Sequence, residues 1–217
     1  MYDFRFEKIV TGNKEVFGYE LLSMPSQLFG KTVEQHFAEL SDIEHVNLLK
    51  KQIAFLKDSC DSLISLNLSI SSLLNSKYTI LISEELYNIM HNNNLSICFE
   101  LSESELAQLD DKDIYRCIEK LRRLGFRFWM DDFGSGQANI ISLVNNLELI
   151  EVVKIDRMVF WHLLENSNEL LISLVKYFRF MDKKVIIEGV ENPEQNSFRE
   201  SIDAYGQGYL FNASSNI

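Results

Sequence analysis

Prolines, long apolar runs and separating linkers are scarce in this sequence of 217 residues. It contains 2 prolines, and no Ser-, Gly- or Pro-rich stretch divides it, so we expect a single domain across residues 1–217. No apolar run is long enough to cross a bilayer. The first eight residues are largely charged or aromatic and lack the apolar core of a signal peptide. We therefore expect a cytoplasmic protein that has no membrane partner.

Paired cysteines and an excess of basic residues are also lacking. Cys60, Cys98 and Cys117 are odd in number and lack the spacing of metal ligands, which predicts free thiols in a reduced compartment. The 21 Lys and Arg residues are outnumbered by 32 Asp and Glu residues, which gives a formal net charge of −11. Because nucleic acid polymers need a basic surface, this charge argues against them as partners. A small anionic ligand is compatible with the composition if cations in its site offset the repulsion.

What the sequence does contain is an alternation of short β-branched and aromatic runs with longer helical patterns. The expected strands are residues 4–10, 15–22, 63–69, 96–101, 126–131, 150–155, 184–188 and, more briefly, 208–211. The expected helices are residues 32–58, 82–92, 112–124, 138–146, 159–181 and 193–201. This α/β alternation favours a parallel sheet covered by helices, either an open doubly wound sheet or a closed (β/α)8 barrel. A hairpin-like turn at residues 11–14 would make one barrel strand antiparallel to the others.

Polar side chains close six of the expected strands. They are Glu20, Asn67, Glu100, Asp131 with Asp132 beside it, Lys154 and Glu188. In a barrel the carboxyl ends of the strands meet at one face, where active sites are built. A single acid at a strand end is usually solvated or caps a helix, but seven polar residues at six strand ends predict a site. Crowded carboxylates repel one another, and hard divalent cations relieve that repulsion. Two such ions bridged by a carboxylate recur in phosphodiester cleavage.

A glycine-rich turn follows one of these strands. Residues 132–136, Asp-Phe-Gly-Ser-Gly, lie between an expected strand and an expected helix. Two glycines permit backbone angles that other residues avoid and let the chain approach a ligand closely. Glycine-rich turns are common, so this run alone indicates a turn and not a function.

Together these residues resemble the successive motifs of the EAL domain family of cyclic di-GMP phosphodiesterases. In chain order the motifs are Tyr19-Glu20-Leu21-Leu22, Asn67-Leu68-Ser69, Glu100-Leu101-Ser102-Glu103-Ser104, Asp131-Asp132-Phe133-Gly134-Ser135-Gly136, Lys154-Ile155-Asp156-Arg157, Glu188-Gly189-Val190-Glu191 and Gln207-Gly208-Tyr209. The resemblance runs from about residue 5 to residue 211. It implies a TIM-like (β/α)8 barrel with one antiparallel strand, an EAL fold that hydrolyses cyclic di-GMP to linear pGpG. Such activity lowers a bacterial second messenger of motility and biofilm formation.

The resemblance also implies two divalent cations, Mg²⁺ or Mn²⁺. The ligands of the first would be Glu20, Asn67, Glu100 and Asp131. The ligands of the second would be Asp131, which bridges the two ions, together with Asp132 and Glu188.

Further roles follow from the same resemblance. Lys154 would orient the attacking water or steady the phosphate, and Gln207 would hydrogen-bond in the same water network. Glu103 and Glu191 would support the loop after Asp132. That loop and the helix after it would form a homodimer interface. The candidate substrate contacts are Leu22, Gly134, Ser135, Gly136 and Tyr209.

Three positions depart from the family pattern. The arginine that commonly ends the first motif, and that contacts a substrate phosphate in relatives, is Met24. The usual Gln-Pro-Ile of the first strand is Glu7-Lys8-Ile9, and the usual Gly-x-Pro after Phe211 begins with Asn212. An active phosphodiesterase is favoured because every metal position is filled. Two alternatives stay open: a cyclic di-GMP receptor without turnover, which Met24 motivates, and a protein-binding regulator.

Overall fold

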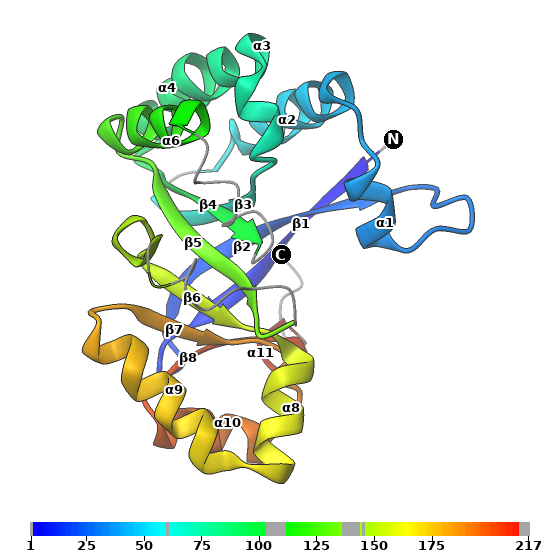
Figure 1. The fold of residues 1–217 in the computed structure, drawn as a ribbon. Helices are drawn as coiled ribbons and strands as arrows, with labels where there is room; N and C mark the ends of the chain where they lie inside the picture. The colour runs from blue at the N-terminus through cyan, green and yellow to red at the C-terminus, as the bar shows by residue number, and fades with distance from the viewer. Residues whose placement is uncertain (1, 60, 103–111, 136–143, 145, 213–217) are drawn as a thin grey trace.

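The computed structural model describes residues 2–59, 61–102, 112–135, 144 and 146–212, and its strands close into a barrel (Figure 1). The described strands follow chain order around the barrel: β1 (Tyr2–Val10), β2 (Val16–Pro25), β3 (Leu63–Asn67), β4 (Ser96–Ser102), β5 (Arg127–Phe133), β6 (Val152–Ile155), β7 (Lys184–Ile187) and β8 (Tyr205–Gln207). β1 is antiparallel to both of its neighbours, β2 and β8, and the other neighbouring strands are parallel. The predicted TIM-like barrel with one antiparallel strand is therefore confirmed.

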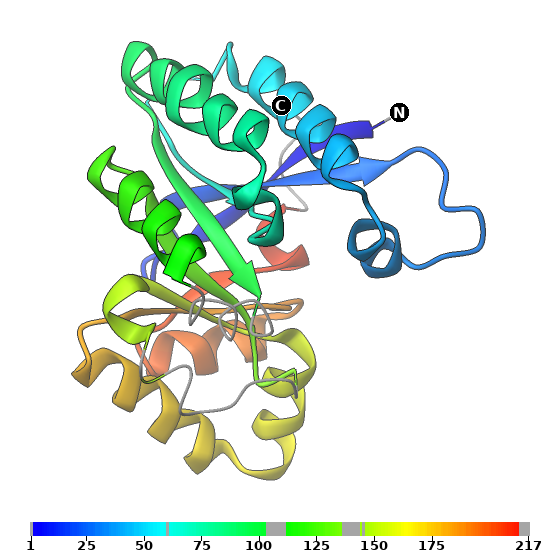
Figure 2. The ribbon, with the colours of Figure 1, turned by 45° about the horizontal axis from the view of Figure 1, so that its top comes forward.

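Helices cover the outside of the barrel. The described ones are α1 (Val33–Ala38), α2 (Asp42–Leu56), α3 (Ser76–Ile80), α4 (Tyr87–Asn92), α6 (Lys112–Arg123), α8 (Arg157–Asn166), α9 (Asn168–Phe180), α10 (Pro193–Ser201) and α11 (Tyr209–Asn212). A π-helical turn (Leu81–Leu86) joins α3 to α4, and 3-10 turns lie at Ser71–Leu74 and Leu147–Leu149. Figures 1 and 2 show α2, α3, α4 and α6 on one side of the barrel and α8, α9 and α10 on the opposite side. None of the described helices is long and apolar enough to cross a membrane.

Two long predicted helices are each divided in the structure. Residues 32–58 form α1 and α2, because Ser41 makes a capping box with Glu44 and so begins a new helix. Residues 159–181 lie in α8 and α9, which Ser167 separates. Most of the predicted helix at 138–146 lies outside the described residues.

The predicted strand at residues 208–211 is wrong. The last strand is Tyr205–Gln207, and residues from Tyr209 onward form α11. The apolar run that suggested a strand, which includes Leu210 and Phe211, packs instead against the core between barrel and helices. β-branched and aromatic residues are common in strands because strands are often buried. Here a helical turn at the end of the barrel buries them instead.

The barrel interior is layered. Its lower part is a small apolar cluster in which one residue from each of five strands is buried: Ile9, Cys98, Trp129, Val152 and Ile186. Alternate residues of a strand face the same side, so the interior residues of the layer nearer the mouth lie two positions later in the parallel strands and two positions earlier in β1. In β4, β5 and β6 those positions carry Glu100, Asp131 and Lys154, and Glu188 directly follows β7. The apolar cluster thus forms the floor of the mouth. Cys98 and Cys117 are free thiols, and Cys60 lies outside the described residues.

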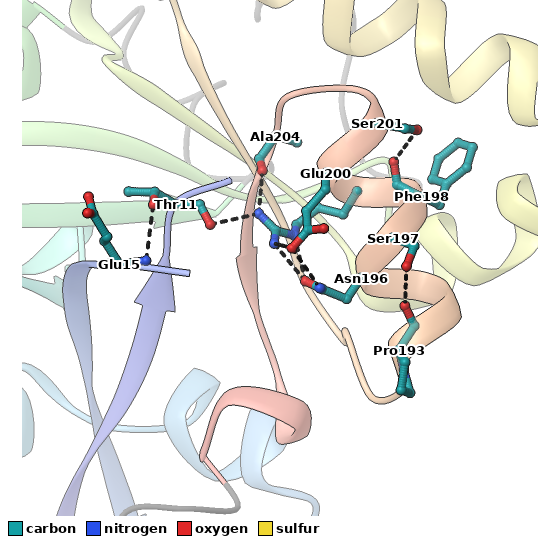
Figure 3. Close-up of polar contacts among 10 residues, drawn as sticks. Thr11, Glu15, Pro193, Asn196, Ser197, Phe198, Glu200, Ser201 and Ala204 are labelled. Carbon is teal, nitrogen blue, oxygen red and sulfur yellow. Dashed lines mark hydrogen bonds and ion pairs between the residues drawn. The ribbon is translucent and has the colours of Figure 1, made fainter. Parts of the chain in front are cut away.

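The barrel closes through a short seam between β1 and β8. The seam pairs Ile9 with Gln207 and Val10 with Gly206. Arg199 of α10, fully buried, spans it: its guanidinium donates to the carbonyl oxygen of Thr11 at 2.9 Å and to that of Ala204 at 2.8 Å (Figure 3).

Two further contacts hold the Arg199 side chain in place, one of its guanidinium and one of its aliphatic stem. The guanidinium donates a hydrogen bond to Asn196 Oδ1 at 2.6 Å. Its aliphatic stem lies over Gly206, where a Cβ atom would come within 2.8 Å of Arg199 Cδ. Glycine at this position therefore makes room for the arginine that fastens the closing strand.

Candidate metal centre and active site

Lys154 lies at the centre of a group of carboxylates inside the barrel mouth. Its Nζ is 2.8 Å from Asp131 Oδ1, 2.8 Å from Glu188 Oε1, 3.1 Å from Glu100 Oε2 and 3.2 Å from Glu20 Oε2. The lysine side chain is 1% exposed, and none of the four acids exceeds 17%. Four strands and the residue that directly follows β7 therefore bring their side chains to one buried ammonium group.

The barrel architecture brings these residues together. Glu100 is two positions after the floor residue Cys98, and Lys154 is two positions after Val152. The same spacing places Asp131 above the floor of the barrel. Since parallel strands point their carboxyl ends to one face, side chains far apart in the sequence become neighbours.

Two amides complete the surroundings of Glu20. Asn67 donates from Nδ2 to Glu20 Oε1 at 3.2 Å, and Gln207 donates from Nε2 to Glu20 Oε2 at 2.6 Å. Both carboxylate oxygens of this buried acid are therefore engaged, and the carboxylate is held in one orientation.

The electrostatics favour a charged lysine. Burial would lower the pKa of Lys154, but the carboxylates of Asp131, Glu100 and Glu188 outweigh burial and raise the pKa well above its usual value. Burial would raise the pKa of Glu20, but the Lys154 ammonium and the hydrogen bonds from Gln207 and Asn67 together outweigh burial and lower that pKa. Lys154 is therefore a permanent ammonium group and cannot serve as a proton acceptor at neutral pH.

One lysine does not neutralise the whole mouth. Burial, with the Glu20 carboxylate second, raises the pKa of Glu100 well above its usual value. Burial is also the main cause that raises the pKa of Glu188 to about 8. Burial and the charge of Asp131 raise the pKa of Asp132 to about 6. The site thus holds more carboxylates than Lys154 can keep ionised.

These carboxylates fit divalent cations. Ligand oxygens of Asp131, Asp132 and Glu188 lie within 4.8 Å of one another. Oε1 of Glu100 is buried and lacks a hydrogen-bond partner of ordinary geometry among the described residues, although the neighbouring Ser65 hydroxyl contributes to lowering its pKa. An all-oxygen set with excess negative charge is the chemistry that Mg²⁺ and Mn²⁺ require.

The turn after β5 departs from regular strand geometry at the mouth. Asp132 is exposed and has a positive φ of 55°, which is uncommon for a residue other than glycine. Gly134 has a φ of 91°, and Ser135 donates its backbone N–H to the Asp132 carbonyl oxygen at 3.1 Å. Gly136 and Glu103, both expected at the site, lie outside the described residues.

The remaining expected residues differ in exposure. Leu22 is half-buried on β2, and Tyr209 is 71% exposed at the start of α11. Glu191 is exposed, and its backbone N–H donates to Gln195 Oε1 at 2.8 Å at the start of α10. The roles expected for these side chains stay predictions.

Glu7 is an acid of this region that the sequence marks only as a departure from the family pattern and not as a site residue. It pairs directly with Glu20 across the antiparallel β1–β2 ladder. Asn212 Nδ2 donates to Glu7 Oε1 at 3.1 Å, and Asn212 Oδ1 accepts the backbone N–H of Lys8 at 3.0 Å. Two departures from the family pattern, one near each end of the chain, therefore contact each other. The signal was the alternation of polar and aromatic residues before Ile9, because β1 runs against the other strands and its early residues face the mouth.

Known proteins match this chain in sequence. The matching family model is that of the EAL domain, over residues 16–214. The chain belongs to the EAL domain family. It is 30% identical over 149 residues to the probable cyclic di-GMP phosphodiesterase PdeB of Escherichia coli. The aligned region covers 68% of the chain and 28% of that protein. It is 32% identical over 152 residues to the cyclic di-GMP phosphodiesterase PdeB of Shewanella oneidensis. This aligned region covers 69% of the chain and 17% of that protein.

Solved structures match this EAL domain in fold. The manganese and cyclic di-GMP complex of Klebsiella pneumoniae BlrP1 superposes with a TM-score of 0.77 at 21% identity, covering 96% of the chain and 55% of that protein. The EAL enzyme Bd1971, in a form with cAMP and cyclic di-GMP bound, has a TM-score of 0.74 at 25% identity and covers 97% of the chain and 61% of that protein. The EAL domain thus spans between about a sixth and two thirds of the length of these four proteins.

Proposed function

We propose that this EAL domain hydrolyses cyclic di-GMP to linear pGpG with the help of two divalent cations, Mg²⁺ or Mn²⁺. The observation that carries the proposal is the meeting of Glu20, Glu100, Asp131 and Glu188 within 3.2 Å of Lys154 Nζ. Relatives at about 30% identity that are named cyclic di-GMP phosphodiesterases support the substrate.

Two groups of oxygen-bearing side chains would hold the cations. Glu20, Asn67, Glu100 and Asp131 would hold one cation. Asp131, Asp132 and Glu188 would hold the other, with Asp131 shared. Bound cations would lower the pKa of a coordinated water and offset the negative charge of the phosphate.

The other side chains of the mouth would position the reactants. Lys154, a permanent ammonium, would donate to the attacking water or to a phosphate oxygen. Gln207 and Asn67 would fix the Glu20 carboxylate through the hydrogen bonds that they already donate. The apolar floor of Ile9 and Trp129 would exclude water from beneath the reacting group, which strengthens the electrostatic interactions above it.

The first test is turnover by the purified protein. Cyclic di-GMP is incubated with the protein and Mg²⁺ or Mn²⁺, and pGpG is separated by chromatography. We expect pGpG with either cation and none in EDTA. Binding of cyclic di-GMP without pGpG under any divalent cation would overturn the enzyme and favour the receptor.

The second test asks whether the assigned acids are needed. Glu20→Gln and Asp131→Asn keep the side-chain shape and remove the charge, so each should abolish hydrolysis while the far-ultraviolet circular dichroism stays that of wild type. Glu39→Gln on the exposed surface is the matched control and should keep full activity. Near-normal activity of either site variant would contradict the ligand assignment.

We also propose a cytoplasmic homodimer that acts in bacterial motility or biofilm signalling. The dimer would form through the loop and helix after Asp132, most of which lies outside the described residues. Light scattering after size exclusion chromatography measures the mass, and a monomer at micromolar concentration would contradict the dimer.

A further inference from the structure

The strands β1 and β2 continue beyond the rest of the barrel. β2 pairs with β3 at Tyr19 and Glu20, and β1 pairs with β8 at Ile9 and Val10. Further toward the mouth, residues 2–6 and 21–25 pair with each other in the described ladder. Figure 1 shows this two-stranded extension reaching past the ends of the other strands. We call residues 2–6 and 21–25 the mouth ribbon.

One face of the mouth ribbon packs against α2. The rings of Phe4 and Phe6 lie 5.3 and 5.5 Å from the ring of Phe55. On the partner strand, Ser23 accepts a hydrogen bond from Gln52 at 3.1 Å. These residues therefore define the face that points outward, toward the helices.

The other face of the mouth ribbon points to the barrel mouth. Side chains alternate between faces along a strand, and directly paired residues of an antiparallel ladder share a face. Arg5 and Glu7 alternate with Phe4 and Phe6, and Glu7 pairs with Glu20, whose carboxylate lies inside the mouth. Arg5 is thus on the same face as the carboxylates, one layer above Glu20.

Arg5 brings an available positive charge to that face. It pairs directly with Leu22 and is diagonal to Met24. Its side chain is exposed and forms no ion pair with a residue that the structure describes. Its charge reaches the site, because it is among the groups that lower the pKa of Glu7, which burial and Glu20 together raise.

Two other cations that the structure describes near the mouth, Lys154 and Arg157, are already engaged. Lys154 is 1% exposed and is surrounded by four carboxylates. Arg157, at the start of α8, stacks over the ring of Trp161 at 5.4 Å. A dianionic ligand that enters this acidic mouth would therefore first meet Arg5, whose planar fork suits the oxygens of a phosphate.

We propose that Arg5 is a substrate-binding residue of this EAL domain and that its guanidinium holds a phosphate group of the cyclic dinucleotide. The mouth face of β2 carries Leu22 and Met24 in the mouth ribbon and so offers no cation, and β1 supplies one from the neighbouring strand. The inference rests on the proposed function for the identity of the ligand. The role of Arg5 concerns the binding of the ligand, whereas the proposed function concerns its cleavage.

The test compares Arg5→Ala and Arg5→Gln with wild type in steady-state hydrolysis of cyclic di-GMP. The loss of a hydrogen-bonded charge contact should raise KM by about 10- to 100-fold. The value of kcat should stay within about twofold, because the contact is made equally in ground and transition states. Lys50→Ala, which removes an exposed cation from the outer helix α2, is the matched control and should leave KM unchanged.

A rescue variant separates a direct contact from a change in fold. Met24→Arg in the Arg5→Ala background returns a guanidinium to the same face at the diagonal position, and it should recover most of the lost affinity. If the double variant binds as weakly as Arg5→Ala alone, or if Lys50→Ala raises KM equally, the direct contact is overturned.

Equilibrium binding keeps this inference distinct from the proposed function. The dissociation constant of cyclic di-GMP is measured by calorimetry in EDTA, where turnover stops, and should rise in Arg5→Ala by the same factor as KM. A wild-type protein that binds without cleaving would sink the enzyme and still support Arg5 if the variant binds more weakly. Equal affinities of wild type and Arg5→Ala would overturn Arg5 alone, and a wild type that does not bind, with or without divalent cations, would overturn both.

Discussion

Lys154 shows at the scale of one residue why the mouth is poised for cations. Burying an ammonium group is costly, and close partners must offset the loss of hydration. Here four carboxylates do so within 3.2 Å. The count of charges still favours the acids, and the raised pKa values of Glu100 and Glu188 express that imbalance.

Replacement of Lys154 by Met should destabilise the metal-free protein by about 3–5 kcal/mol, because it leaves buried carboxylates without a counter-charge. Urea unfolding in EDTA measures the change, and hydrolysis should be lost at the same time. Lys50→Met, an exposed lysine, is the control. A Lys154→Met protein as stable as wild type in EDTA would contradict this account of the mouth.

Glu188 gives the metal-free protein a defined pH dependence. Its pKa in the folded protein is about 8, against 4.5 for the ordinary side chain, so the folded state binds the proton more tightly than the unfolded chain. Its contribution to stability is therefore greatest at low pH and is lost as the pH rises through about 8. Thermal unfolding in EDTA between about pH 5.5 and about pH 9 should show this decline.

Two comparisons test the assignment to Glu188. Glu188→Gln should flatten the decline over the same pH range. Binding of Mg²⁺ near pH 7 should release protons, because the carboxylates must be ionised to bind it. Stability that rises steadily with pH in EDTA would show that the acid is not buried as the structure has it.

At the scale of elements, the seam between β1 and β8 depends on α10. Two residue pairs join the strands, and Arg199 adds hydrogen bonds to carbonyl groups on both sides. The seam also places Gln207 against Glu20. The contacts of Arg199 at the seam therefore help to hold the Glu20 carboxylate in its orientation at the mouth.

Replacement of Arg199 by Met should lower the free energy of unfolding by about 2–4 kcal/mol, because several buried acceptors lose their donor. Arg199→Lys should be nearly as destabilising, since one ammonium cannot reach acceptors placed for a planar fork. Arg116→Met, which breaks an exposed pair with Asp113, is the control and should stay close to wild type. A small effect of Arg199→Met in urea unfolding would mean that the strand pairs alone close the barrel.

At the scale of the whole molecule, the net charge of −11 and the acidic mouth act together. A net negative charge repels anions, so a dianionic ligand needs local cations to bind. Divalent cations in the mouth and Arg5 above it would meet that need in two successive layers.

Addition of Mg²⁺ or Mn²⁺ should therefore raise the unfolding temperature of the EDTA-treated protein. Ligand at about 100 times its dissociation constant stabilises the fold by about 2.7 kcal/mol. Asp131→Asn should reduce the shift, since Asp131 belongs to both of the proposed ligand groups. An unchanged unfolding temperature at millimolar cation would argue against a metal centre.

The sequence by itself determined the fold class and the polar residues that the barrel gathers. Strand periodicity is local, so Glu100 and Asp131 could be recognised as strand ends without any knowledge of their neighbours. The order of motifs then led to the family, which the match over residues 16–214 confirms. Their roles as cation ligands stay predictions.

Only the tertiary structure decided which other residues join them. The short β8 and the helix after it depend on what packs against them, so their boundaries could not be read locally. In the sequence Arg199 resembles an ordinary surface residue of a helix. The structure shows that it is buried and packs over Gly206. Arg5 and Glu7 lie at the beginning of β1, and they face the mouth because that strand alone among the described ones runs against the others. The direction of a strand and the neighbour of a side chain are properties of the assembled barrel, which explains why the sequence indicated the carboxylates and the fold revealed the cation above them.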